Sequence, residues 1–118
     1  MRVSVFQFSP EWLNHRQNLQ EVALTCKSLA GKTDFLLLPE MFSTGYILDT
    51  RLLSSEWQEV TIDALTKLAN EYQMKIGGSI PFFRSGRWYN TFVFVDKNGI
   101  MGSYDKIRKS YRNGLAVV

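Results

Sequence analysis

The chain has 118 residues, of which 45% are hydrophobic and 21% are charged, values typical of one globular domain and not of a disordered segment. Its net charge is +3, and its aromatic residues are not interleaved with lysine and arginine, so we expect no nucleic-acid partner. A single cysteine excludes an internal disulfide, and no apolar run is long enough to cross a bilayer. With no signal-peptide pattern at its N-terminus, the sequence favours a cytoplasmic location without membrane contact.

The first half of the chain alternates strand-like and helical patterns. Polar and apolar residues alternate over 2–8 and predict a strand, and apolar residues at helical spacing predict a helix over 12–30. Residues 34–38 (DFLLL) are typical of a short strand that is buried on both faces, and Pro39 is expected to end it. Residues 40–50 show no period and are predicted to form a loop.

The second half of the chain predicts one helix followed by three strands. The helix is expected to begin at Ser54 or Ser55 and end at Tyr72, and the strands to span 75–80, 87–95 and 100–104. Pro81 is expected to end the first of these strands, and residues 96–99 predict a hairpin turn. The order β-α-β-α-β-β-β indicates an α/β layered fold. No element is predicted after 104, and two helices would leave one face of the sheet largely uncovered.

Glu40 is the most informative candidate for chemistry. It follows a buried strand at the position where α/β sheets present ligand-binding groups. The apolar residues around it are expected to desolvate the carboxyl group, which would raise its pKa toward that of a general base. The alternative is an ordinary glutamate of a surface loop. Lys106, just beyond the last predicted strand, could stabilise an oxyanion near Glu40, or it could be a solvated lysine.

Two other reactive residue types point to structure more than to chemistry. Cys26 lies on the apolar stripe of the first predicted helix, where a thiol behaves as a small hydrophobic group with a raised pKa. His15 is expected on the polar side of the same helix, and no role is assigned to it. Gly77 and Gly78 indicate close packing against the backbone of a strand. No cysteine and histidine cluster has the spacing of a metal site.

Three motifs, in order, resemble those of the nitrilase superfamily of carbon–nitrogen hydrolases. Residues 37–42 (LLPEMF) resemble the motif that supplies the general base, residues 89–91 (YNT) a recurring strand segment, and residues 102–106 (GSYDK) the motif of the catalytic lysine. The resemblance implies that the chain is the N-terminal part of a four-layer αββα sandwich. It also implies that Glu40 and Lys106 are catalytic residues.

The form of residues 39–46 (PEMFSTGY) is similar to the omega-amidase branch, whose members deaminate short oxo-acid monoamides such as 2-oxoglutaramate. The resemblance implies acyl transfer through a cysteine thiolate, with the counterpart of Glu40 as base and that of Lys106 at the oxyanion. It further implies a small-molecule amide substrate, no metal or organic cofactor, and a homo-oligomeric full-length parent.

The end of the chain departs from the family pattern. No cysteine follows Cys26, and Arg108 stands where members of the family usually carry a histidine. We interpret residues 1–118 as a partial domain whose match is strongest over 1–107 and lost over 108–118. The expectation is a truncated hydrolase without its nucleophile, inactive alone. The alternative is a non-catalytic short protein that binds a small ligand or assembles with another chain.

Overall fold

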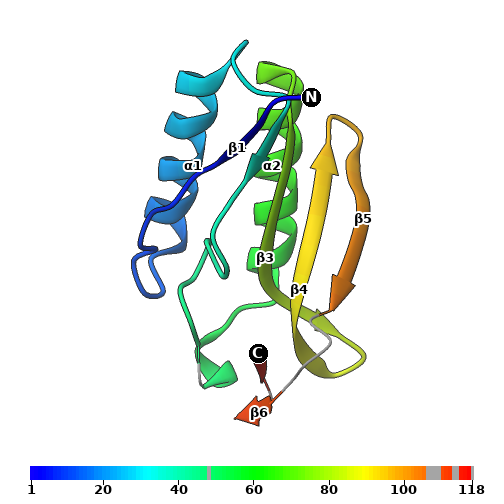
Figure 1. Cartoon of the computed structure of the whole chain (residues 1–118). Coiled ribbons are helices and arrows are strands. Elements are labelled where there is room, and N and C mark those ends of the chain that lie inside the picture. Colours follow the sequence, from blue (N-terminus) through cyan, green and yellow to red (C-terminus); the bar gives the residue numbers. More distant parts are fainter. Residues whose placement is uncertain (48, 106–109, 113–114, 118) are drawn as a thin grey trace.

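One mixed β-sheet organises the chain (Figure 1). The computed structural model describes residues 1–47, 49–105, 110–112 and 115–117. The elements in these residues are β1 (Val3–Val5), α1 (His15–Leu29), β2 (Phe35–Leu37), the short 3-10 helix η1 (Thr50–Leu52), α2 (Glu56–Tyr72), β3 (Lys75–Arg84), β4 (Arg87–Asp96), β5 (Gly99–Asp105), β6 (Ser110–Arg112) and β7 (Leu115–Val117). None of the helices in the described residues is long and apolar enough to cross a bilayer.

The sheet has a parallel half and an antiparallel half. β1, β2 and β3 run parallel, and β3, β4 and β5 are joined as antiparallel neighbours, so β4 lies between β3 and β5 as a central strand. The carboxyl ends of β1 and β2 therefore meet at one edge, where β2 ends opposite Gly77 of β3. The amide of Leu38 extends this pairing past the end of β2 by donating to the carbonyl of Gly77 (2.8 Å). Residues that follow β2 are thus led along β3.

The main core lies between the sheet and the two helices, which cover the same face of it (Figure 1). The sheet contributes its inward residues and the helices contribute one apolar stripe each, as the helical spacing of apolar residues predicts. Fully buried members include Val22, Cys26, Leu36, Leu65, Ile76, Val93 and Val95. Each such side chain contributes about 1.5–3 kcal/mol by leaving water, so this layer carries most of the hydrophobic stabilisation.

The second face of the sheet carries no helix among the described residues. Strand register places Val3, Val5, Phe83 and Tyr104 on this face, and their exposed fractions are 56%, 63%, 39% and 51%. Between them lies a ring cluster of Phe35, Phe92 and Phe94, in which the Phe92 ring also stacks on Tyr104 at 5.6 Å. The uncovered apolar face expected from the sequence is therefore present in the described part of the chain.

Pro81 does not end its strand, contrary to the sequence prediction. β3 continues through it to Arg84, and Pro81 lies opposite Asn90 of β4. The pairing of β2 with β3 reaches only Gly77, so in the described part of the chain one side of β3 faces no strand at Pro81. A proline is tolerated in such a position because its missing donor is not needed there.

The other differences from the predicted elements are local. Helix α1 begins at His15 and not at residue 12, because Asn14 caps it by accepting the amide of Gln17 (3.3 Å) and Leu13 adopts a left-handed φ of 57°. Strands β6 and β7 lie in a segment where the sequence indicates no element. The remaining helix and strand bounds agree with the predictions to within a few residues.

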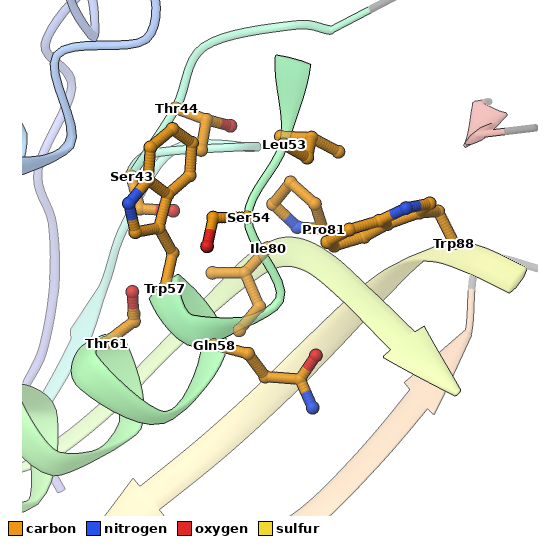
Figure 2. Close-up of a pocket in the computed structure, with 10 residues that line it drawn as sticks. All are labelled: Ser43, Thr44, Leu53, Ser54, Trp57, Gln58, Thr61, Ile80, Pro81 and Trp88. Atoms are coloured by element: carbon orange, nitrogen blue, oxygen red, sulfur yellow. The ribbon is translucent and has the colours of Figure 1, made fainter. Parts of the chain in front are cut away.

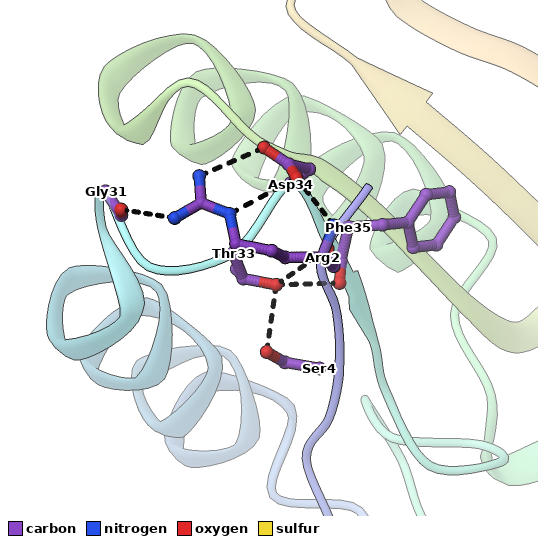
Figure 3. Close-up of polar contacts among 6 residues, drawn as sticks. All are labelled: Arg2, Ser4, Gly31, Thr33, Asp34 and Phe35. Carbon is purple, nitrogen blue, oxygen red and sulfur yellow. Dashed lines mark hydrogen bonds and ion pairs between the residues drawn. The ribbon is translucent and has the colours of Figure 1, made fainter.

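Polar contacts join the segments directly before β1 and β2 (Figure 3). The guanidinium group of Arg2 donates to the carbonyl of Gly31 (2.9 Å) and to the carboxylate of Asp34 (3.2 Å). The hydrogen bond from Arg2 lowers the pKa of Asp34. Both side chains are about half exposed, so solvent screens the pair, and its role is to fix the start of β1 against β2 more than to stabilise the fold.

Candidate active site

Glu40 lies at the carboxyl edge of β2, half-buried, in the turn that follows Pro39. Its Oε1 accepts a hydrogen bond from Nδ2 of Asn90 in β4 (3.1 Å), fifty residues away in the sequence. The hydroxyl group of Tyr46 forms a second side-chain hydrogen bond with Glu40. Two neutral donors from different segments therefore hold the carboxylate, which is the arrangement that a positioned base needs.

Tyr46 keeps its proton beside Glu40. Desolvation by burial, together with the hydrogen bond and the negative charge of Glu40, raises the pKa of Tyr46 to about 12. The phenol therefore stays a donor to the carboxylate at neutral pH. Its backbone is held as well, because the indole Nε1 of Trp12 donates to the carbonyl of Tyr46 (3.0 Å).

The backbone directly after Glu40 is in an unusual conformation. Met41 is fully buried and adopts a φ of +54°, a left-handed geometry that residues other than glycine rarely take. Its amide donates to the hydroxyl of Ser79 (3.0 Å), and its carbonyl accepts the amides of Thr44 (3.3 Å) and Gly45 (2.8 Å). Such strain persists where the surroundings fix it, and here Ser79, Thr44 and Gly45 hold the backbone directly after Glu40.

Asn18 of α1 anchors the loop that carries Tyr46. This side chain is 1% exposed, and its Oδ1 accepts the amide of Glu11 (2.8 Å). Its Nδ2 donates to the carbonyls of Glu11 (2.8 Å) and Ser43 (3.0 Å). Both polar atoms of this buried amide are thus satisfied, and it ties the first helix to the loop after Glu40.

Phe42 packs the same loop against the sheet through a glycine. A Cβ atom on Gly78 would come within 2.8 Å of the Phe42 ring, a distance that real contacts do not reach. Similarly, a Cβ on Gly77 would lie 2.9 Å from the ring of Phe92 on the other face. The close packing predicted for Gly77 and Gly78 is confirmed, and at Gly78 it positions the segment next to Glu40.

Asn90 differs from Asn18 in how its polar atoms are used. It is 0% exposed, and its Nδ2 donates to Glu40, but its Oδ1 has no hydrogen-bond partner among the residues that the structure describes. A buried acceptor without a partner costs about 1–3 kcal/mol. The neighbouring residues of β4 on the same face, Trp88 and Phe92, are aromatic.

The last described residue before Lys106 is firmly held. Asp105 ends β5 opposite Thr91, accepts the hydroxyl of Thr91 (2.7 Å), and forms an ion pair with Arg84. Since Thr91 is adjacent to Asn90, the described part of β5 ends beside the strand that holds Glu40. Lys106 itself, the second predicted catalytic residue, lies outside the described residues, so its place relative to Glu40 stays a prediction.

The cysteine and the histidine are both structural in this fold. Cys26 is fully buried in the core, and burial raises the pKa of its thiol to about 12, which confirms its interpretation as a core residue. His15 is not on a polar face as expected, because it is only 8% exposed and sits between the two helices. Its ring stacks on Trp57 at 5.1 Å, and Nε2 lies 2.7 Å from the hydroxyl of Thr61. Desolvation lowers the pKa of His15.

A small pocket lies next to the loop that follows Glu40 but does not include Glu40 (Figure 2). It is lined by Ser43, Thr44, Leu53, Ser54, Trp57, Gln58, Thr61, Ile80, Pro81 and Trp88. Its cavity of about 10 Å³ holds roughly one water molecule, too little for an amide substrate. A larger, open depression of about 370 Å³ lies between the amino ends of β2 and β3 and the end of α2, far from Glu40.

The sequence matches the family model of the carbon–nitrogen hydrolases over residues 2–117. The chain belongs to the carbon–nitrogen hydrolase family. The chain is similar to the omega-amidase YafV of Escherichia coli, with 26% identity over 106 residues. It is also similar to the omega-amidase YafV of Yersinia enterocolitica, with 28% identity over 106 residues. Each of these matches covers 90% of this chain and 41% of the relative.

An amidase from Nesterenkonia sp. has a similar fold, with a TM-score of 0.85 at 20% identity, over 97% of this chain and 45% of that protein. In one variant of that amidase, acrylamide has added to the active-site cysteine. The predicted α/β fold is thereby confirmed as the N-terminal part of a nitrilase-like fold. The hydrolase-family chain spans about two fifths of the length of the omega-amidases that it matches.

Sequence reasoning placed Glu40 at the sheet edge but assigned no role to Asn90 or Tyr46. Both lie within the motifs that carry the resemblance, YNT and PEMFSTGY. The contact of Asn90 with Glu40 depends on how β2 and β4 are placed across β3, and no local pattern contains that information. The signal that could have found Asn90 is a polar residue at an apolar-facing position of a central strand.

Proposed function

We propose that this chain supplies the general base of a carbon–nitrogen hydrolase that acts on a non-peptide amide. The observation that carries the proposal is the half-buried carboxylate of Glu40, held at the sheet edge by Asn90 and Tyr46. In a family of carbon–nitrogen hydrolases, a carboxylate fixed in this way is suited to accept and return a proton. The similarity to omega-amidases favours deamidation of a short oxo-acid monoamide such as 2-oxoglutaramate.

The proposed reaction proceeds by acyl transfer. Glu40 accepts the proton of a cysteine thiol, and the thiolate attacks the amide carbon to form a tetrahedral oxyanion, which the ammonium group of Lys106 stabilises. Collapse of this species breaks the carbon–nitrogen bond, and ammonia leaves with the proton from Glu40. Glu40 then takes a proton from water, whose hydroxide attacks the thioester and releases the acid and the thiol. The scheme uses no metal or organic cofactor.

Cys26 is not suited to be the nucleophile of this scheme. It is the only cysteine in the sequence, it is fully buried, and its raised pKa keeps it protonated at neutral pH. The nucleophile would have to come from outside these 118 residues, so the proposal includes a chain that is inactive alone. A reduced, solitary thiol also agrees with a cytoplasmic location, which is part of the proposal.

Ammonia release tests the proposal. The 118-residue chain with 2-oxoglutaramate is expected to give no ammonia above a blank. A chimera in which residues 1–105 replace the matching segment of E. coli YafV is expected to release ammonia, and to keep doing so when Cys26 is changed to serine. The proposal would be wrong if the chain alone turned over and lost this activity in Cys26→Ser, or if a folded chimera with native secondary structure released no ammonia.

The uncovered sheet face supports a second proposal, which concerns assembly. Val3, Val5, Phe83 and Tyr104 leave an apolar surface on the face without helices in the described part of the chain. Apolar surfaces of this kind are rare on monomers. In the αββα sandwich that the motifs imply, a second sheet would cover this face, and we propose that a second copy of the chain covers it where residues 1–118 stand alone.

A further inference from the structure

We propose that Asn90 is a positioning residue for Glu40, with its buried amide held in β4 to orient the carboxylate as a base. The inference rests on the proposed function, because it concerns the same carboxylate. It adds a residue to which neither the motif resemblance nor the comparisons give a role. The geometry behind it is the 3.1 Å hydrogen bond from Nδ2 of Asn90 to Oε1 of Glu40.

The side-chain amide of Asn90 uses only one of its two polar atoms within the described residues. Asn90 is fully buried, yet its Oδ1 has no hydrogen-bond partner within the described residues. Asn18, equally buried, satisfies both of its polar atoms and acts as a structural clip. A side chain kept only for stability would follow the pattern of Asn18 or be apolar. Within the described residues, the side-chain hydrogen bond that Asn90 makes is the one to Glu40.

Asn90 lies in β4, opposite Pro81 of β3. Its neighbours on the same face of β4, Trp88 and Phe92, are aromatic, so an apolar residue at position 90 would continue the pattern. Instead, β4, which is paired with strands on both of its sides, presents a donor to the turn after β2. A donor on a rigid strand can fix the orientation of a carboxylate that projects from a turn.

The two donors to Glu40, Asn90 and Tyr46, come from different segments of the chain. Tyr46 reaches Glu40 from the loop that follows it, and its pKa of about 12 keeps it protonated through the range in which a glutamate titrates. Asn90 reaches Glu40 from the sheet and does not titrate. Neither of these two donors changes its charge up to neutral pH, so neither adds a charge change of its own next to Glu40.

The test uses carbon-13 NMR of the 118-residue chain. The Glu40 carboxyl signal is assigned by its loss in Glu40→Gln, and its pKa is measured in the native chain, in Asn90→Leu and in the control Asn70→Leu, which changes an exposed asparagine of α2. Removing a donor to the charged form should raise the pKa of Glu40 by about one unit in Asn90→Leu, a tenfold change in its dissociation constant, and by nothing measurable in Asn70→Leu.

A second measurement needs no substitution at position 90, in case Asn90→Leu does not fold. In the native chain, the side-chain amide protons of Asn90 should shift with the same pKa as the Glu40 carboxyl, and this titration should disappear in Glu40→Gln. An unchanged Glu40 pKa in a folded Asn90→Leu, or an Asn90 amide that does not sense Glu40, would overturn the inference. Neither NMR readout requires catalytic turnover. A folded chimera that releases no ammonia would refute the proposed function, whereas the contact between Asn90 and Glu40 is tested by the NMR measurements alone.

Discussion

Gly78→Ala is expected to destabilise the chain and to disturb the loop that positions Glu40. The new Cβ would lie 2.8 Å from the Phe42 ring and 3.0 Å from Cβ of Leu38, both in the packed core. Forcing one extra carbon into such a site costs about 1–3 kcal/mol. Replacing a glycine within a strand returns about 0.5–1 kcal/mol through the lower entropy of the unfolded chain. We therefore expect a net loss of about 0–2.5 kcal/mol in the free energy of unfolding.

Urea unfolding followed by circular dichroism measures this change, and Gly102→Ala is the matched control. Gly102 is also a strand glycine, but a Cβ there would meet no atom within 4 Å, so its alanine variant should be neutral or slightly more stable. In Gly78→Ala, the NMR signals of the Glu40 loop should shift as well, because Phe42 has to move. Equal stability of the two alanine variants would refute the argument that close packing of Phe42 on Gly78 fixes this loop.

Three further predictions concern the core, its pH dependence and the uncovered face. Because the pKa of His15 is lowered in the folded chain, the unfolded chain binds a proton at higher pH than the folded chain does. The free energy of unfolding should therefore fall as the pH drops below about 6.5, by at most ~1.4 kcal/mol per pH unit. This pH dependence should vanish in His15→Gln. Cys26 should resist a thiol reagent in the native chain and react fully in 6 M guanidinium, a standard unfolding condition; rapid native labelling would contradict its burial. The molar mass measured by light scattering should rise with the concentration of the chain, and Val5→Lys and Tyr104→Lys should each weaken this self-association. A monomer at all concentrations would refute the assembly proposal.

The sequence predicted most of the fold because its elements have strong local signals. The apolar stripes of α1 and α2 recur at helical spacing, and the short apolar run before Pro39 is typical of a buried strand. Pro81 misled the prediction, because a proline is excluded from a strand only where both sides are paired, and pairing is a tertiary fact. His15 misled it for a similar reason, because its burial depends on how α2 packs against α1.

The candidate site was predictable only in part. Glu40 could be found because one strand and one proline fix its place at the sheet edge. Asn90 could not be found as a donor to it, because Asn90 and Glu40 are fifty residues apart and meet only through the order of the strands. The left-handed backbone of Met41 is also invisible in the sequence, since nothing local favours that geometry in a methionine.

The central claim is that Glu40 is the general base of a carbon–nitrogen hydrolase. The most direct measurement is the kcat for ammonia release from 2-oxoglutaramate by the chimera with E. coli YafV. It is measured in the chimera itself, in its Glu40→Gln variant and in its Glu59→Gln variant, which changes an exposed glutamate as a control. The account predicts a loss of about 10²–10⁴-fold in Glu40→Gln and an unchanged rate in Glu59→Gln. A Glu40→Gln chimera that is folded and retains its full kcat would contradict it.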